Sequence, residues 1–302
     1  MIISRRQKLL LLKFLSLFSV IRGYNVLVIA LAQYLTSLYI LAPDSSVAAI
    51  LFDPYLFCIV AASAIAIASG YIINSFYDAE KDLINRPTKT LLDRIVSQRF
   101  KLTTYFVLNF VSVIFASYVS FRSVVFFSSY IFGIWFYSHK LKRIPFLGNL
   151  VSATLAIAPF FAIFVYYKNF QLVIFVHAVF LFLIILIREL VKDLQNIKGD
   201  LAQNYKTIAV VYGERSSKFI ITLFTLLSFV PAYLLITRFE VGHMYLFFYS
   251  CIILLLVFLI ILWRSSTKTH YVILHNILKF IIISGVLSIL LIDIDLVLHR
   301  IH

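Results

Sequence analysis

The sequence has 302 residues, of which 62% are hydrophobic and 13% are charged, and its formal net charge at pH 7 is +14. Soluble domains usually contain roughly 45–50% apolar and about 25% charged residues, so this chain lacks the polar surface that a soluble fold of its size needs. The composition excludes an ordinary soluble domain and predicts an all-α, polytopic bundle of membrane helices. No Gly, Ser or Pro-rich linker divides it, so residues 1–302 are expected to form one domain.

Apolar runs follow one another along the chain after a basic N-terminal segment. Residues 1–22 contain Arg5, Arg6 and Lys8 but no small-residue cleavage site, and we interpret them as an uncleaved cytoplasmic flank. A membrane helix needs about 20 apolar residues. The runs are apolar all round, which favours helices over the alternating strands of a membrane barrel. We predict nine spans, at residues 24–41, 56–76, 102–120, 123–138, 146–166, 171–191, 217–237, 243–263 and 276–298.

Basic residues are distributed unevenly between the predicted loops. With the N-terminus in the cytoplasm, 23 of the 27 Lys and Arg residues lie inside, and Arg122, Lys168, Arg238 and Arg300 lie outside. The positive-inside rule favours this orientation, which requires an odd number of spans and places the C-terminus outside. The expected location is the plasma (inner) membrane of a bacterium. Because the basic residues are explained by topology, no nucleic acid partner is expected, and no obligate protein partner is inferred.

A first polar cluster follows the second predicted span. It reads Asn74-Ser-Phe-Tyr-Asp78-Ala-Glu-Lys-Asp82. Asn74, Asp78 and Asp82 are spaced i, i+4 and i+8, so they lie along one face if the second helix continues through them. Acidic residues are costly near a bilayer, which makes their positions informative about function.

A second polar cluster follows the sixth predicted span. Asp193, Asn196 and Asp200 are spaced i, i+3 and i+7, which again places them along one helical face. Each cluster follows an even-numbered span, so both are expected at the cytoplasmic membrane surface. A helical bundle could therefore bring the two clusters face to face.

The residue types of the two clusters predict a metal and diphosphate site. Carboxylate and amide oxygens are hard ligands that suit Mg²⁺, which keeps several waters and is usually completed by substrate phosphates. A diphosphate would bridge two such clusters, and neighbouring cations would share the charge that grows on it as it departs. The candidate diphosphate-binding cations in the same set of loops are Arg86, Lys89, Lys142, Arg143, Lys198 and Lys206.

At these residues the chain resembles the UbiA family of intramembrane prenyltransferases, and the resemblance covers almost its whole length. The family has nine helices, a first motif of the type Asn-Asp-x-x-Asp-x-x-x-Asp and a second of the type Asp-x-x-Asp-x-x-x-Asp. The first motif is similar to the segment from Asn74 to Asp82, which continues as Leu-Ile-Asn-Arg-Pro at 83–87. The second is similar to the segment from Asp193 to Asp200. Ser75 and Asn196 stand where the family usually has Asp.

Shorter segments extend the resemblance. They are Arg22-Gly-Tyr-Asn25, Tyr137 with Leu141-Lys-Arg143 ahead of Gly148-Asn149, and Lys206-Thr207. By resemblance, Asn25, Tyr137 and Asn149 are expected to reach into the substrate pocket. Residues 83–87 and 141–143 look most similar to the group that includes geranylgeranylglycerol-phosphate geranylgeranyltransferases.

The resemblance also implies a mechanism. Mg²⁺ would hold the diphosphate of an isoprenyl diphosphate, the allylic C–O bond would break, and a lipophilic or aromatic acceptor of quinone-precursor or prenylglycerol-phosphate type would capture the prenyl cation. Arg86, Lys142 and Lys206 would clamp the diphosphate. The implied metal ligands are Asn74, Asp78, Asp193, Asn196 and Asp200, and the implied catalytic residues are Asp78, Asp82, Asp193, Asp200 and Glu189.

Two other functions stay open at this point. A family member that binds an isoprenoid or another lipid without turnover is one, since Ser75 and Asn196 remove two charges from the motifs. A polytopic transporter is the other. Transporters usually place their coupling residues near the membrane midplane on broken helices, whereas the acidic residues here lie at helix ends.

Overall fold

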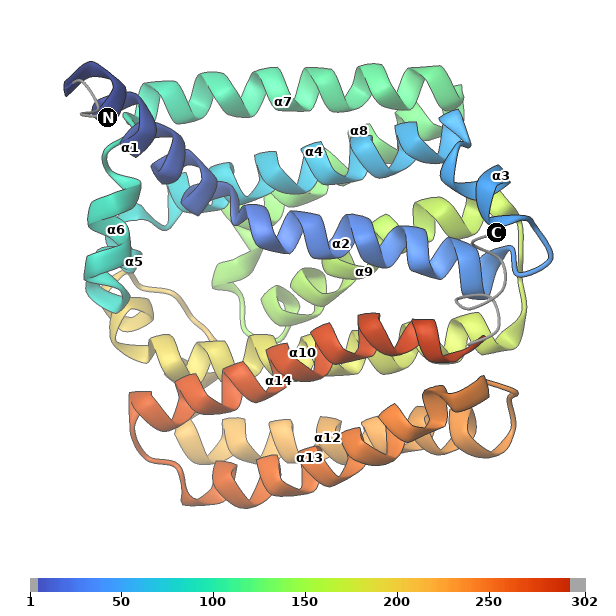
Figure 1. The fold of residues 1–302 in the computed structure, drawn as a ribbon. Coiled ribbons are helices and arrows are strands. Elements are labelled where there is room, and N and C mark those ends of the chain that lie inside the picture. The colour runs from blue at the N-terminus through green and yellow to red at the C-terminus, as the bar shows by residue number, and fades with distance from the viewer. Residues whose placement is uncertain (1–4, 294–302) are drawn as a thin grey trace.

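A single bundle of long helices makes up the computed structural model, which describes residues 5–293 and contains no strand in that range. The helices run roughly along one common direction, with the short helices α5 and α6 at one end (Figure 1). The first half comprises α1 (Arg5–Ile21), α2 (Gly23–Thr36) with the π-helical turn η1 (Ser37–Leu41), α3 (Val47–Leu51), α4 (Pro54–Tyr77), α5 (Ala79–Asn85), α6 (Pro87–Asp93), α7 (Gln98–Val119) and α8 (Phe121–His139). The second half comprises η2 (Leu141–Arg143), α9 (Leu147–Tyr167), α10 (Leu172–Ala202), α11 (Ile208–Val211), α12 (Gly213–Thr237), η3 (Gly242–Met244), α13 (Tyr245–Arg264), α14 (Lys268–Ser288) and η4 (Ile289–Leu291).

The number of helices that qualify as membrane spans is one lower than predicted. Within residues 5–293, eight helices are long and apolar enough to cross a membrane. A long helix, α8, occupies the position of the predicted fourth span but is not one of the eight. Its Arg122, its serines and His139 lower the hydropathy of an otherwise apolar segment. Within the described residues, eight of the nine predicted segments correspond to these spans, and the segment predicted at 123–138 lies in α8.

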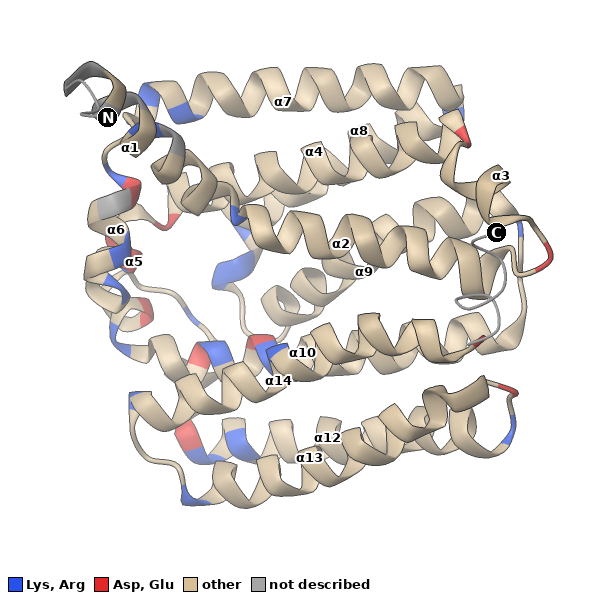
Figure 2. Cartoon of the chain, viewed as in Figure 1, with Lys and Arg blue, Asp and Glu red and all other residues tan. Residues whose placement is uncertain are grey.

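The two ends of the described chain lie at opposite ends of the bundle. Helix α1, which forms much of the predicted flank, begins at the end that carries α5 and α6, and η4 ends at the other (Figure 1). Most Lys and Arg residues gather at the α5–α6 end (Figure 2). The described chain therefore begins at the end of the bundle where most basic residues lie and ends at the opposite one. Arg300 and the end of the predicted last span lie outside the described residues.

Helix α4 does not continue through the first polar cluster as expected. It ends at Tyr77, and Asp78 has φ −92° and ψ 4°, which differ from regular helix values. Backbone hydrogen bonds persist on both sides of this bend, from Asp78 N to Asn74 O and from Asp82 N to Asp78 O. The chain therefore bends at Asp78, where α4 ends and α5 begins one residue later.

Helix α10 runs further than the predicted sixth span. It is one continuous helix of 31 residues, from Leu172 to Ala202. It carries the second polar cluster on its last three turns, beyond the predicted end at residue 191. Because the cluster is part of a rigid helix, the positions of its side chains are set by the packing of α10 in the bundle.

Proline in α9 is accommodated by side chains of neighbouring helices. Pro159 has no N–H, so the carbonyl of Leu155, four residues earlier, loses its helical partner. The hydroxyl of Tyr130 on α8 donates to this oxygen at 3.2 Å. Gln33 on α2 donates from Nε2 to the Pro159 oxygen at 2.9 Å. These bonds tie α2, α8 and α9 together around the interior of the bundle, where water cannot satisfy the backbone.

Candidate active site

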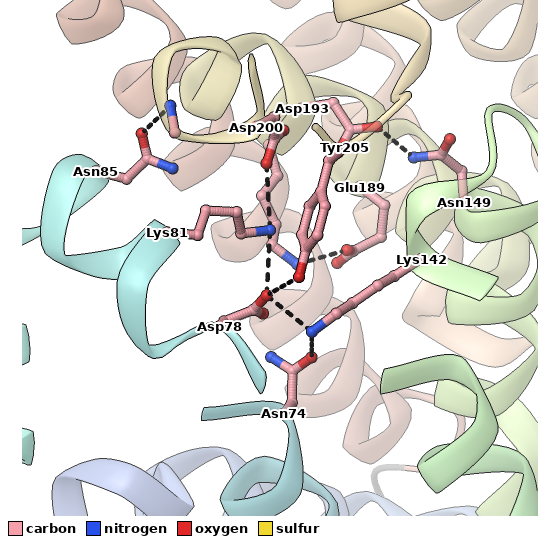
Figure 3. Close-up of polar contacts among 12 residues, drawn as sticks. Asn74, Asp78, Lys81, Asn85, Lys142, Asn149, Glu189, Asp193, Asp200 and Tyr205 are labelled. Carbon is pink, nitrogen blue, oxygen red and sulfur yellow. Dashed lines mark hydrogen bonds and ion pairs between the residues drawn. The ribbon is translucent and has the colours of Figure 1, made fainter. Parts of the chain in front are cut away.

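The two polar clusters meet through one lysine. The Nζ atom of Lys81 on α5 lies 3.4 Å from Oδ1 of Asp78 and 3.2 Å from Oδ1 of Asp200 on α10 (Figure 3). Both carboxylates are buried. Burial lowers the pKa of Lys81, but the two carboxylates outweigh burial and raise it above its usual value. The first and second clusters, predicted to face each other, are thus joined across the gap between α5 and α10.

Asp78 also accepts two hydrogen bonds from the connections that follow α8 and α10. Lys142 on η2 donates to Oδ1 of Asp78 at 2.7 Å and to Oδ1 of Asn74 at 3.3 Å. The hydroxyl of Tyr205 donates to the same Asp78 oxygen at 3.1 Å (Figure 3). Three donors from three segments therefore converge on one buried carboxylate.

The pKa shifts of this group keep its charges in place at neutral pH. Burial raises the pKa of Asp78, but the ammonium groups of Lys142 and Lys81 outweigh it and hold that pKa well below its usual range. Burial lowers the pKa of Lys142 to about 8, against the raising effect of Asp78. Burial and the Asp78 charge raise the pKa of Tyr205 to about 12, so its phenol stays protonated and donates.

Local backbone geometry places Lys142 over the site. Gly148 is the second residue of α9, and a Cβ atom on it would lie 3.1 Å from Cα of Lys142 on η2. A larger residue would push η2 away from α4. The next residue, Arg143, accepts a backbone hydrogen bond at its oxygen from Lys206 N at 3.1 Å, and its guanidinium lies 4.9 Å from the centre of the Tyr205 ring. The connection after α8 is therefore fastened to the connection after α10.

Helix α5 is held against α10 by a close approach at Gly199. The side chain of Asn85 accepts a hydrogen bond from Gly199 N at 3.2 Å (Figure 3). A Cβ atom on Gly199 would lie 2.3 Å from Nδ2 of Asn85, so any larger residue requires the Asn85 side chain to move. This contact brings Lys81, one turn before Asn85, within reach of Asp200.

A hydrogen bond from a residue of α9 fixes the side chain of Asp193. Asn149 donates from Nδ2 to Oδ2 of Asp193 at 2.8 Å (Figure 3). One turn along α10, the side-chain oxygen of Asn196 is buried and has no hydrogen-bond partner. An amide oxygen shut off from water without a donor is unfavourable, and a cation or a water bound to a cation would satisfy it.

Glu189 forms its own charged cluster one turn before Asp193. Its carboxylate pairs with Lys192 at 2.8 Å and with Arg188 at 3.2 Å. Glu189 also lines a cavity next to the site, and its role in orienting a ligand or accepting a proton stays a prediction.

A cavity of about 590 Å³ adjoins the site. Of the six side chains of the two clusters, Asn74 lines it, whereas Asp78, Asp82, Asp193, Asn196 and Asp200 do not. Asn74, Glu189 and the predicted pocket residues Asn25 and Tyr137 line it, and Asn25 is fixed by a hydrogen bond of 3.1 Å to the hydroxyl of Tyr71. Asn149 does not line it but bonds to Asp193 instead. Basic side chains predominate among the charged residues of the lining, which are Arg22, Arg86, Lys89, Arg188, Lys192, Lys279 and Glu189. Such a lining suits an anionic headgroup.

The remaining predicted residues lie around the cluster without joining its side-chain contacts. Asp82 is half-buried on α5, and the contacts that join the two clusters do not include it. Lys198 and Lys206 are exposed. Lys89 pairs with Asp93 at 3.8 Å, and burial together with Arg22 and Arg86 lowers its pKa. The diphosphate roles of these lysines stay predictions.

The donor set fits a divalent metal that substrate would complete. Within residues 5–293, no three His, Cys, Asp or Glu side chains lie close enough to hold a metal by themselves. Mg²⁺ is commonly bound through one or two carboxylates together with substrate phosphates and water, so a full protein cage is not required. Asp78, Asp200 and the unpartnered oxygen of Asn196 are oxygen donors of the right kind. The Lys81 ammonium between the two carboxylates shows that this position favours positive charge.

Sequence reasoning missed two residues at the centre of the site. Lys81 lies three residues after Asp78, so helical spacing alone would have placed it on the same side. Tyr205 lies outside both motifs, and no local pattern connects it with Asp78, 127 residues earlier. Only the three-dimensional arrangement of the connection after α10 reveals it.

Comparison with known proteins shows which family this chain is similar to. The model of the UbiA prenyltransferase family matches residues 30–281. A digeranylgeranylglyceryl phosphate synthase of Thermococcus sibiricus is 34% identical over 166 residues, which cover 55% of this chain and 59% of that protein. The same enzyme of Thermococcus gammatolerans is 28% identical over 205 residues, which cover 67% of this chain and 74% of that protein. The chain thus spans about three fifths to three quarters of these relatives.

Solved structures share the fold. One described as digeranylgeranylglyceryl phosphate synthase in membranes has a TM-score of 0.69 and 19% identity, and the match covers 92% of this chain and 97% of that one. A UbiA homologue from Archaeoglobus fulgidus bound to GPP and Mg²⁺ has a TM-score of 0.66 and 13% identity, and the match covers 91% and 99% of the two chains. With its long apolar helices, the chain is a multi-pass integral membrane protein. It belongs to the UbiA prenyltransferase family.

Proposed function

We propose that this protein transfers an isoprenyl group from a prenyl diphosphate to a prenylglycerol-phosphate type acceptor within the membrane. The observation that carries the proposal is the junction of the two motifs, where Lys81 lies between Asp78 and Asp200. Lys142 links Asp78 to Asn74, which lines a cavity with mostly basic charged side chains. Oxygen ligands and cations on one side of a cavity, within an apolar bundle, suit a molecule with a diphosphate head and a hydrocarbon tail.

The chain's own residues would hold and neutralise the diphosphate. Lys81 and Lys142 compensate the motif carboxylates and are placed to turn toward phosphate oxygens when these arrive. Arg86 lines the same cavity and would add a cation to the leaving group. The allylic C–O bond breaks with its electron pair on the diphosphate, and the acceptor oxygen forms the new C–O bond. The proton of the acceptor hydroxyl leaves to a base, for which Glu189 at the cavity is the candidate.

Mg²⁺ is proposed as the cofactor, with Asn74, Asp78, Asp193, Asn196 and Asp200 as the residues that would hold it. When bound, it would neutralise charge on the departing diphosphate. The support from relatives is the solved UbiA homologue whose description includes GPP and Mg²⁺. Asp82 would act at longer range, through a water or a second ion.

The acceptor class rests on sequence similarity and on the cavity. The curated relatives cited above are named digeranylgeranylglyceryl phosphate synthases. An acceptor of that kind carries a phosphate, and the cations of the cavity lining outnumber its single carboxylate. An uncharged acceptor would leave more of this positive charge uncompensated. We therefore favour the phosphate-bearing acceptor over an uncharged one.

We also propose that the end of the bundle with the motifs faces the cytoplasm. The basic residues at that end support this orientation through the positive-inside rule (Figure 2). Single cysteines on a background without Cys58 and Cys251 would test it. A cysteine at Asp44, opposite the motifs, should react with an impermeant thiol reagent from outside intact cells, and one at Lys198 should not.

The test of the activity is an assay of purified protein in lipid with Mg²⁺ and labelled prenyl diphosphates. The acceptor panel should contain prenylglycerol phosphate, hydroxybenzoate, dihydroxynaphthoate and haem. Transfer to prenylglycerol phosphate that stops when Mg²⁺ is chelated is the expected result. If the protein binds prenyl diphosphate but releases no diphosphate with any combination of donor and acceptor, it is a catalytically silent family member. Movement of a substrate across the membrane without chemistry would indicate a transporter.

A further inference from the structure

Lys279 is a cation inside a membrane span. It lies on α14, 11 residues after Lys268, where the span begins. At 1.5 Å per residue this is roughly 16 Å along a helix that crosses ~30 Å of hydrocarbon. A charged side chain at such a position is costly and usually marks a functional site. Lys279 lines the 590 Å³ cavity that Asn74 also lines, here called the polar cavity.

The charge of Lys279 has no carboxylate beside it. Its Nζ atom donates to the hydroxyl of Tyr24 on α2 at 3.1 Å and lies 4.2 Å from the centre of the Tyr24 ring. None of the ion pairs among residues 5–293 includes Lys279. A phenol and its ring hold the ammonium group in place but do not neutralise it.

Arg22 is a second cation of this kind. It joins α1 to α2, two residues before Tyr24, and it lines the same cavity. Its guanidinium lies 5.0 Å from the centre of the Tyr71 ring, and it too is absent from the ion pairs of the described chain. Tyr71 is three residues before Asn74 on α4, less than one helical turn away. Arg22 is therefore close to the first motif without belonging to it.

The chemistry of this part of the cavity differs from that of the motifs. At the motifs, carboxylates accompany the lysines, which suits an anion held through a metal ion. The single carboxylate of the cavity lining, Glu189, is already paired with Arg188 and Lys192. Arg22 and Lys279 therefore keep two positive charges. A phosphate monoester carries a charge of about −1.5 to −2 at neutral pH, which two such cations match without a metal.

We propose that Arg22 and Lys279 form a second anion site, which binds the phosphate of the acceptor directly and so selects a phosphorylated acceptor over its dephosphorylated form. The inference rests on the proposed function, from which the acceptor class comes. The acceptor is the chosen occupant because the donor's diphosphate is assigned to the motifs, where the carboxylates lie. A phosphate held by Arg22, near Asn74, keeps the acceptor hydroxyl close to the donor.

The experiment compares the wild type with Lys279→Met, Arg22→Gln and the charge-preserving variant Lys279→Arg. Arg264→Met is the matched control, because Arg264 is an exposed cation at the end of α13 that does not line the polar cavity. Prenylglycerol phosphate and prenylglycerol serve as acceptors with geranylgeranyl diphosphate and Mg²⁺, and KM is measured for each acceptor and for the donor. Binding of labelled prenylglycerol phosphate to protein in lipid nanodiscs, without donor or Mg²⁺, gives Kd. Thermal unfolding confirms that each variant is folded.

Lys279→Met and Arg22→Gln should each raise the KM and Kd for prenylglycerol phosphate by about tenfold or more, since each loses a hydrogen bond to a charged group. The KM values for prenylglycerol and for the donor should stay unchanged. Lys279→Arg and Arg264→Met should resemble the wild type.

An unchanged Kd for prenylglycerol phosphate in both folded variants would overturn the inference. Equal weakening of the two acceptors would also overturn it, by assigning the cations to packing, and so would a rise in the donor KM alone, by assigning them to the diphosphate. A phospholipid that copurifies with the wild type and is lost from Lys279→Met, with an unchanged Kd for the acceptor, would assign them to a membrane lipid. Weaker acceptor binding in the two variants, with no transfer by the wild type, would support the site and refute the proposed activity.

Discussion

Lys142 donates a hydrogen bond of 2.7 Å to Oδ1 of Asp78, and both side chains are buried. The lysine belongs to the connection between α8 and α9, and the aspartate lies at the bend after α4. A buried pair between separate segments holds those segments in place, and each charge depends on the other for compensation. Replacement of one partner should therefore affect the fold as well as the reaction.

Lys142→Met should destabilise the protein by about 1–3 kcal/mol, because it leaves a buried carboxylate with fewer donors, although Lys81 and Tyr205 still contact Asp78. Thermal unfolding in lipid nanodiscs measures the change. The double variant Asp78→Asn with Lys142→Met should lose less stability than the two single variants lose together. Strictly additive effects would show that the pair is not coupled.

Tyr205→Phe separates the hydroxyl of Tyr205 from its ring. The variant loses the 3.1 Å hydrogen bond to Asp78 but keeps the ring, which lies 4.3 Å from Nζ of Lys81. A moderate fall in kcat is expected, corresponding to about 1.5 kcal/mol for a hydrogen bond to a charged group. Tyr205→Ala removes the ring as well and should be more damaging. Equal rates for Tyr205→Phe and the wild type would show that the hydroxyl does not orient Asp78.

Gly199→Ala should disturb the docking of α5 on α10, since the added Cβ would lie 2.3 Å from Nδ2 of Asn85. We expect lower stability and lower activity, because Lys81 is one turn from Asn85 on the same helix. Asn85→Ala removes the clash, so the double variant should recover part of the stability lost in Gly199→Ala. A double variant that is no more stable than Gly199→Ala would contradict the steric explanation.

Asn149→Leu tests the orientation of Asp193. The variant keeps a similar volume but removes the 2.8 Å hydrogen bond from Nδ2. If the bond positions a metal ligand, the Mg²⁺ concentration needed for half-maximal activity should rise by about tenfold, as for other partners of metal ligands. A Mg²⁺ titration of the initial rate measures this. Loss of rate at all Mg²⁺ concentrations with an unchanged midpoint would instead point to a role in packing.

Much of the fold could be predicted because membrane helices follow directly from long apolar runs. The facing positions of Asp78 and Asp200 also followed, since helical spacing and an even number of preceding spans place both at one end of the bundle. The bend at Asp78 could not be predicted, because no Pro or Gly marks it. At this bend, Lys142 and Tyr205 donate to Asp78 from segments distant in sequence, and no local pattern indicates these contacts.

The central claim is that the two motifs act together on a prenyl diphosphate. Diphosphate release from geranylgeranyl diphosphate, with prenylglycerol phosphate present and Mg²⁺ varied, tests it most directly in the wild type, Asp78→Asn, Asp193→Asn and Asp44→Asn. Asp44 is exposed at the opposite end of the bundle and serves as the control. We predict Mg²⁺-dependent release by the wild type and Asp44→Asn, and a loss of about 100-fold or more in each motif variant. Near-normal release by folded Asp78→Asn or Asp193→Asn would contradict the account.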